Sequence, residues 1–128
     1  MTFQYSVAVR NAALDVKETT IGTSPILKLF SGAEPANCAA ADPTGLLATI
    51  TLPSDWMSAA AAGVKAKLGV WSNTASGTGT IASWRIYDSG LVACHIQGNT
   101  TDMTFDSTNV TTGQIITVST YQWTAGNA

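Results

Sequence analysis

Short runs in which apolar and polar residues alternate are the main feature of this chain. Such alternation predicts half-buried strands, because successive side chains of a strand point to opposite faces. The run at residues 46–52 shows it most clearly, and in the run at 65–71 we expect Ala66, Leu68 and Val70 to point inward. Further strands are predicted at residues 26–30, 81–87, 91–97, 103–105 and 115–123. In the last strand the inner face is either Ile116, Val118 and Thr120 or Ile115, Thr117 and Tyr121.

The strands on either side of Asp88-Ser89-Gly90 can be paired from their pattern. A three-residue hairpin loop that ends in glycine is common, because Gly90 can take the left-handed conformation there. This loop length places Trp84 opposite Cys94 on one apolar face, whereas a slip of one residue would mix the two faces. The same register pairs Tyr87 with Leu91, Ile86 with Val92, and Ala82 with Ile96.

The N-terminal segment is predicted to form a helix over residues 6–21. Ser6 can cap its start and Gly22 can close its end. One apolar stripe at helical spacing is expected to face the core, and it comprises Val9, Ala12, Ala13, Val16 and Thr20. A second apolar line on the opposite side is either a contact for a neighbouring subunit or a set of ordinary exposed residues, and it comprises Val7, Leu14 and Ile21.

Together these elements predict a mainly β chain. The expected architecture is a two-sheet antiparallel β-sandwich, jelly-roll or Greek-key like, with one N-terminal helix. We assign residues 1–24 to the helical segment and residues 25–128 to the β-sandwich, within a single domain overall. The segment at residues 31–45 is rich in Ala, Pro, Asn and Asp, and it is expected to be a surface loop.

The chain carries few charges. Of its 128 residues 11% are charged and 45% are hydrophobic, and the net charge is −2, whereas about 25% charged residues is usual. No basic run is present, so we expect no nucleic-acid partner. Neither an apolar stretch of membrane-spanning length nor a signal peptide is visible, so we expect no membrane partner and synthesis in the cytoplasm. An uncharged polar exterior suits assembly.

No catalytic, metal or cofactor site is predicted. His95 is expected to be exposed opposite Ser83, but a hydrolase would also need an orienting carboxylate and an oxyanion site. Asp102, Thr104 and Asp106 share one strand face, where they could hold a cation or discourage pairing of sheet edges. Because a calcium loop would offer more oxygen ligands, we favour the second alternative. We therefore expect no enzyme activity.

The two cysteines, Cys38 and Cys94, match no metal-binding spacing. They allow one disulfide, and the alternative is a pair of buried thiols that act as small hydrophobic side chains. The second alternative suits a reducing cytoplasm. The sequence leaves the redox state of the pair open.

The tryptophans are the remaining candidates for binding. Tryptophan on strands fills cores or anchors interfaces, and it can stack on sugars where it lines a groove. We expect Trp84 to lie in the core. Trp56 follows the turn signal at Pro53, and we predict it as an interface or ligand residue. The other two are Trp71 and Trp123.

Three segments carry a resemblance to a known group of proteins. They are SPILKLFSGAEPANCAAADPTGLLATITLP, KLGVWSNTASGTGTIASWRIYDSG and CHIQGNTTDMTFDSTNVTTGQIITVSTYQWTAGN. In this order they resemble small β-sandwich structural proteins of tailed-bacteriophage virions, of the kind that cement or decorate the capsid. The resemblance covers nearly the whole chain and rests on turn and strand patterns such as Arg85-Ile86-Tyr87-Asp88-Ser89-Gly90, with no catalytic motif.

The resemblance implies a virion structural protein on the capsid surface, made in the host cytoplasm. Its implied partners are the major capsid protein and further copies of this chain, as dimers or trimers. Such a protein binds across capsid subunits and stabilises the shell, and we expect the helix and the loop at 31–45 to make the contacts. The alternative is a tail, baseplate or fibre component that contacts host glycans through exposed aromatic residues.

Overall fold

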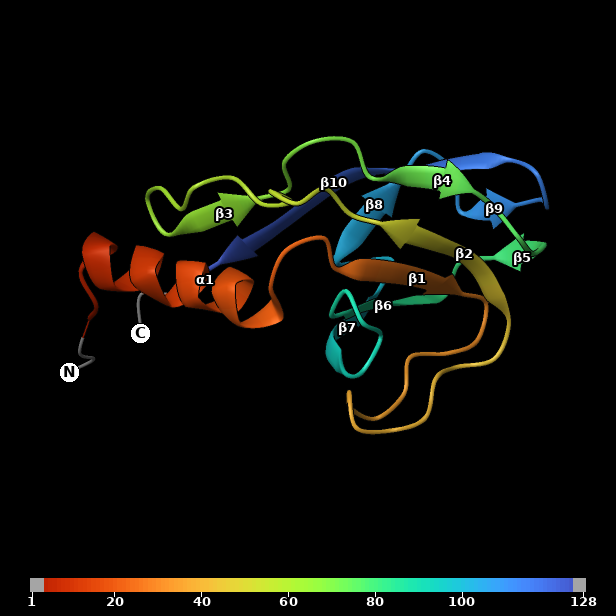
Figure 1. Cartoon of the computed structure of the whole chain (residues 1–128), viewed down its shortest axis with the longest axis horizontal. Coiled ribbons are helices and arrows are strands. Elements are labelled where there is room, and N and C mark those ends of the chain that lie inside the picture. Colours follow the sequence, from red (N-terminus) through yellow and green to blue (C-terminus); the bar gives the residue numbers. More distant parts are fainter. Residues whose placement is uncertain (1–3, 126–128) are drawn as a thin grey trace.

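The computed structural model describes residues 4–125 and confirms a mainly β chain with one helix. The helix α1 (Val7–Ile21) is capped by Ser6 and closed by Gly22, as predicted. Figure 1 shows it extending beyond the strands, beside β3. The strands are β1 (Ile26–Phe30), β2 (Leu46–Thr51), β3 (Val64–Ala66), β4 (Ser72–Thr74), β5 (Gly79–Thr80), β6 (Ser83–Tyr87), β7 (Cys94–Asn99), β8 (Met103–Phe105), β9 (Asn109–Val110) and β10 (Ile115–Thr124).

The first sheet has the antiparallel order β2-β1-β6-β7. Leu27 of β1 lies opposite Ile50 of β2 on one side and opposite Ile86 of β6 on the other. Every residue of β6 is buried. Trp84 and Ile86 belong to the hydrophobic core, whereas the alternate residues of β6 contact the loop at residues 31–45. This sheet is therefore covered on both faces at β6.

The second sheet is built around β10, with β3 and β4 following one another along it and β8 also paired with it. The pairing of β10 with β8 shifts between Val118 and Thr120, so Ser119 is an extra residue. Ile116 and Val118 are buried before this bulge, and the buried residues after it are Tyr121 and Trp123. The bulge explains why simple alternation left two possible inner faces. The two-stranded pair β5-β9 completes the pairing of the described strands.

A cluster of aromatic rings, the aromatic cluster, occupies the centre of the core. Trp84 meets Tyr121 edge to face with ring centroids 5.2 Å apart, and Trp56 meets Trp123 in the same way at 5.4 Å. The prediction that Trp56 is an interface or ligand residue is wrong, because its side chain is fully buried here. Its indole Nε1 donates to the carbonyl of Gly22 at 2.9 Å, which ties the end of α1 to the core. The cluster consists of Trp56, Trp71, Trp84, Tyr121 and Trp123.

The predicted register of the β6–β7 hairpin is wrong. Trp84 lies opposite Gly98, not Cys94, and the loop between the two strands covers residues 88–93. A Cβ atom at position 98 would lie 2.5 Å from the Trp84 ring, so only glycine leaves space for this ring over β7. Leu91, with φ 56°, takes the left-handed conformation that was expected of Gly90. The space that Trp84 needs therefore outweighs the preference for a short loop.

The stretch at residues 65–71 also differs from its prediction. Leu68 and Val70 are 41% and 72% exposed, whereas Lys65 and Trp71 are buried. Trp71 has more apolar surface to bury than either aliphatic residue, and Lys65 has carboxylate partners on α1.

Among the described residues, no helix is both long enough and apolar enough to cross a membrane.

The contact between Trp84 and Gly98 gives a test of the observed register. Gly98→Ala places a methyl group against the indole ring, and we expect it to lower the free energy of unfolding by about 1–3 kcal/mol. Urea unfolding followed by tryptophan fluorescence measures this loss. The control is Gly90→Ala, whose added Cβ has only ordinary contacts with its neighbours. Equal stability of the two variants would contradict the observed register.

Candidate functional site

Leu14 and Ile21 are the buried side chains of α1, and they form the face through which the helix packs on the rest of the chain. These residues were predicted to lie on the outer line with Val7, either as a contact for a neighbouring subunit or as ordinary exposed residues. That prediction is wrong for Leu14 and Ile21, which are 0% and 7% exposed within their own chain, whereas Val7 is half exposed. The physical reason is size, because the larger leucine and isoleucine remove more apolar surface from water than the alanines and valines of the other stripe.

Polar contacts hold α1 beside β3 and the end of β10. Arg10 Nε donates to the carbonyl of Ala125 at 3.0 Å, and the amide of Gly63 donates to Asn11 Oδ1 at 2.9 Å. Lys65 Nζ, on β3, lies 2.7 Å from carboxylate oxygens of both Asp15 and Glu18. The Lys65 side chain is 3% exposed, so its charge depends on these two partners.

The pKa values of this ion-pair group are shifted in opposite directions. The hydrogen bond from Lys65 lowers the pKa of Asp15 below its ordinary 3.8. Burial alone would lower the pKa of Lys65, but hydrogen bonds to Asp15 and Glu18 outweigh it and raise the pKa above 10.5. Asp15 therefore contributes stability that is lost as the pH falls through its folded pKa, and Lys65 contributes stability that is lost as the pH rises through its own.

The stripe of α1 that was predicted to face the core is exposed instead. Val9 and Val16 are 51% and 61% exposed, and Ala12, Ala13 and Thr20 are also exposed. These residues recur at helical spacing, so they form one continuous face on the outside of the helix. An apolar helix face in contact with water is typical of a surface that binds another molecule.

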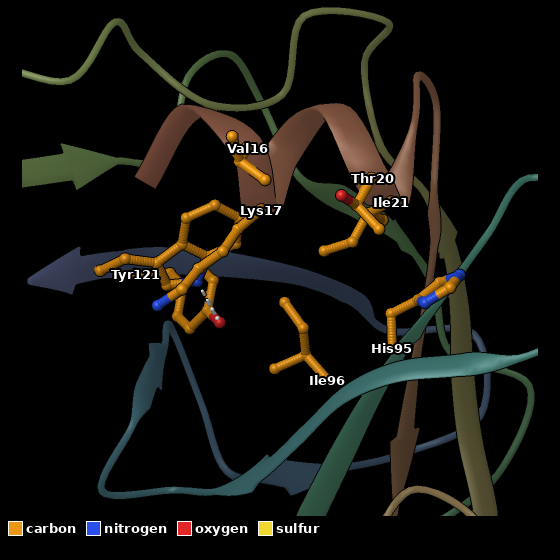
Figure 2. A pocket seen from close by; sticks show the side chains of 8 residues that line it. Val16, Lys17, Thr20, Ile21, His95, Ile96 and Tyr121 are labelled. Carbon is orange, nitrogen blue, oxygen red and sulfur yellow. Dashed lines mark hydrogen bonds between the residues drawn. The ribbon is translucent and has the colours of Figure 1, made fainter. Parts of the chain in front are cut away.

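This stripe leads into a groove between α1, β7 and β10, with a volume of about 460 Å³. Figure 2 shows Ile21 of α1 and Ile96 of β7 pointing into the same space. Tyr121 Oη accepts a hydrogen bond of 2.7 Å from Trp123 Nε1, and burial raises the pKa of Tyr121, so the phenol stays neutral. The lining residues are Val16, Lys17, Thr20, Ile21, His95, Ile96, Tyr121 and Trp123.

We refer to Val9, Val16, Thr20 and Ile96 as the helix–groove surface. The floor of the groove is apolar, so an apolar side chain of a partner could bind there, with Lys17 and His95 at the groove available for polar contacts. The sequence pattern identified the stripe but assigned it to the core. The groove itself was missed, because its walls come from three segments that are far apart in the chain.

A second polar region, besides the contacts of Lys65, surrounds Arg85 of β6. It lies on the face of the first sheet that is turned away from the hydrophobic core, and Arg85 is its central residue. Its side chain is 2% exposed. Nη1 donates to the carbonyl of Ala40 and to Asp42 Oδ1, and Nη2 donates to the carbonyl of Asn37 and to Gln97 Oε1, all at 3.0 Å. Arg85 therefore determines where the loop at residues 31–45 lies on the sheet. No local pattern in the sequence marked it.

Tyr87, next but one to Arg85, supports the same loop. Its hydroxyl donates to Asp42 Oδ1, and burial together with this hydrogen bond raises the pKa of Tyr87. The phenol therefore stays protonated and donates this bond throughout the neutral range. Lys28 Nζ lies over the Tyr87 ring at 5.2 Å from its centroid.

Ser83 and His95, the pair considered for hydrolysis, do not meet. Ser83 lies opposite Asn99, and its buried hydroxyl donates to the carbonyl of Gly32 at 2.7 Å. His95 Nε2 lies 3.8 Å from Asp88 Oδ2. The pairing of His95 with Ser83 was wrong because the hairpin register differs by four residues.

The three residues considered for a cation each have a structural partner. Asp102 Oδ2 accepts from the amide of Asn99 at 3.1 Å, Asp106 Oδ1 accepts from an amide of β10 at 3.1 Å, and the Thr104 hydroxyl bonds that of Thr120. Within residues 4–125, no three His, Cys, Asp or Glu side chains gather as a metal site would require. These carboxylates act in turns and strand contacts.

Comparison of the chain with protein-family models, with curated proteins and with solved structures finds no match.

The ion-pair group predicts a pH-dependent stability. In the double variant Asp15→Asn/Glu18→Gln the Lys65 ammonium is buried without a carboxylate, so we expect a lower Tm at pH 7. Because the wild type loses the Asp15 charge in acid, the difference in Tm should shrink as the pH falls below 3.8. Adding Lys65→Met to the double variant should recover most of the lost Tm, since this substitution removes the unpaired buried charge. A difference that stays constant down to pH 2 would contradict this account.

The contacts of Arg85 predict a large effect of a conservative change. A lysine cannot reproduce hydrogen bonds to four acceptors, so Arg85→Lys should lower the free energy of unfolding by about 2–4 kcal/mol. Arg10→Lys is the matched control, because within residues 4–125 Arg10 makes one such hydrogen bond, from Nε to the carbonyl of Ala125, and we expect a loss of about 1 kcal/mol from this substitution. Chemical denaturation measures both. A loss at Arg85 no larger than that at Arg10 would refute the role of Arg85.

Proposed function

We propose that this chain is a structural protein of a phage particle that decorates or cements the capsid through its helix–groove surface. The observation that carries the proposal is the exposed apolar stripe of α1, which ends in an apolar groove. The partner would be the major capsid protein, which would present an apolar side chain or helix face to this surface. The resemblance of the three sequence segments to virion structural proteins supports the choice of partner.

The mechanism we propose is stabilisation by binding. A chain that contacts two neighbouring capsid subunits binds the assembled shell and not the separate subunits, so it shifts the equilibrium toward assembly. Many copies on one particle, as dimers or trimers, make weak individual contacts sufficient. The low charge of the chain supports this, because few charges must be desolvated when its surface is covered.

We also propose that the two sheets form the layers of a β-sandwich of jelly-roll or Greek-key type. Its support is that one hydrophobic core takes side chains from both sheets and from α1. The alternative role, glycan binding by a tail or fibre protein, has less support. All four tryptophans are at most 9% exposed, so none of them offers a stacking surface.

The capsid hypothesis can be tested with two matched double variants. Val9→Ser/Val16→Ser changes the helix–groove surface, and Val70→Ser/Ile115→Ser removes exposed apolar residues elsewhere. We expect purified wild type and the second variant to sediment with stripped capsids of the phage that encodes the chain, and to raise the rupture temperature of the shell. The first variant should bind at least about tenfold more weakly. Lack of wild-type binding would refute the function, and equal binding by both variants would refute the surface.

A further inference from the structure

Cys38 and Cys94 lie together although 56 positions separate them in the chain. Cys38 belongs to the loop at residues 31–45, and Cys94 begins β7 opposite Tyr87. Their Sγ atoms are 3.0 Å apart, which is closer than unbonded sulfur atoms normally pack. Disulfide geometry is specific, and most cysteine pairs in a fold cannot reach it without movement of the backbone. In this chain the two sulfurs need only a small approach.

The position of Cys38 is held by the contacts of Arg85. The two terminal nitrogens of Arg85 donate to the carbonyls of Asn37 and Ala40 at 3.0 Å each, and these two residues lie on either side of Cys38 in the sequence. Gln97 Nε2 donates to the carbonyl of Pro35 at 2.7 Å, which fixes the same loop from β7. The approach of the two thiols is therefore a built feature of the loop and the sheet, independent of the helix–groove surface.

Both cysteines are accessible to a small reagent. They are half-buried, and they line an open hollow of about 730 Å³ whose other walls come from the loop and from the β6–β7 hairpin. Arg85 and Tyr87 form part of the same hollow. A low-molecular-weight disulfide can therefore reach the thiols without unfolding of the chain.

We propose that Cys38 and Cys94 are a modification site that closes to an intramolecular disulfide by exchange with a low-molecular-weight disulfide. The Cys38 thiolate attacks the reagent RSSR, which forms a mixed disulfide and releases RS⁻. The Cys94 thiolate then attacks the Cys38 sulfur and releases the second RS⁻. The two protons of the protein thiols pass through solvent to the two leaving thiolates. The protein loses two electrons, and RSSR gains them to become two RSH molecules.

The surroundings of the two thiols set the order of these steps. Burial, followed by the contact with Cys38, raises the pKa of Cys94 to about 12, so its thiolate is rare at neutral pH. A rare thiolate reacts slowly with a reagent in solution, so Cys94 acts in the second step, on the Cys38 sulfur that already lies beside it. The closed disulfide joins the loop to β7 and holds it over Arg85.

The test uses the full chain, reduced and then incubated with oxidised glutathione at pH 8. We expect intact-mass measurement to show the loss of two hydrogen atoms, and peptide mapping to show Cys38 joined to Cys94 within one chain. Because the cross-link restricts the unfolded chain between these residues, the Tm should rise by about 10 °C. Treatment with dithiothreitol should reverse both changes.

Cys94→Ser and Cys38→Ser separate the two steps. Cys94→Ser should accumulate a glutathione adduct on Cys38, without a comparable rise in Tm. Cys38→Ser should react slowly with glutathione disulfide, because burial keeps the Cys94 thiolate rare. The proposal fails if wild type keeps stable adducts on both cysteines, if it forms linked dimers, or if its thiols stay free under these conditions. These outcomes are independent of capsid binding, so a failure here leaves the proposed function standing.

Discussion

The packing of large aromatic side chains in the core is the constraint on which the other features of this fold depend. Such rings bury more surface than any other side chain, and an edge-to-face pair adds about 0.5–1.5 kcal/mol beyond burial. Trp84 needs a glycine opposite it, and Gly98 therefore sets the pairing of β6 with β7. Tyr121 and Trp123 need a bulge before them in order to reach the same core. The paths of three strands follow from these requirements.

The same packing decides how α1 is attached. Trp56 donates to the end of the helix, and Leu14 and Ile21 complete its contact with the domain. Because these two side chains are sufficient to attach the helix, the valines and alanines of the stripe that contains Val9 and Val16 remain exposed to water. A helix that is anchored at one face and apolar on the opposite face is suited to joining its own domain to a second molecule. This is the physical basis of the capsid-binding role that we propose.

The other side of the first sheet depends on a buried charge. Arg85 is taken out of water on β6, and most of its hydrogen bonds end on one loop. Removing those acceptors would leave a buried guanidinium without partners, so the loop has a strong preference for this one position. The adjacency of Cys38 and Cys94 follows from that preference. A polar network therefore gives a long irregular segment a defined conformation.

Local patterns in the sequence were sufficient for the helix from Ser6 to Gly22, for β1, for β8 and for the mainly β class, because caps and alternation act between neighbouring residues. The tertiary structure alone decided which helix face is buried, the register of the β6–β7 hairpin and the inner face of β10. Each of these depends on the size of a side chain and on the space that a distant residue leaves for it. The helix–groove surface and the Arg85 network have the same origin, since their parts come from segments that only folding brings together.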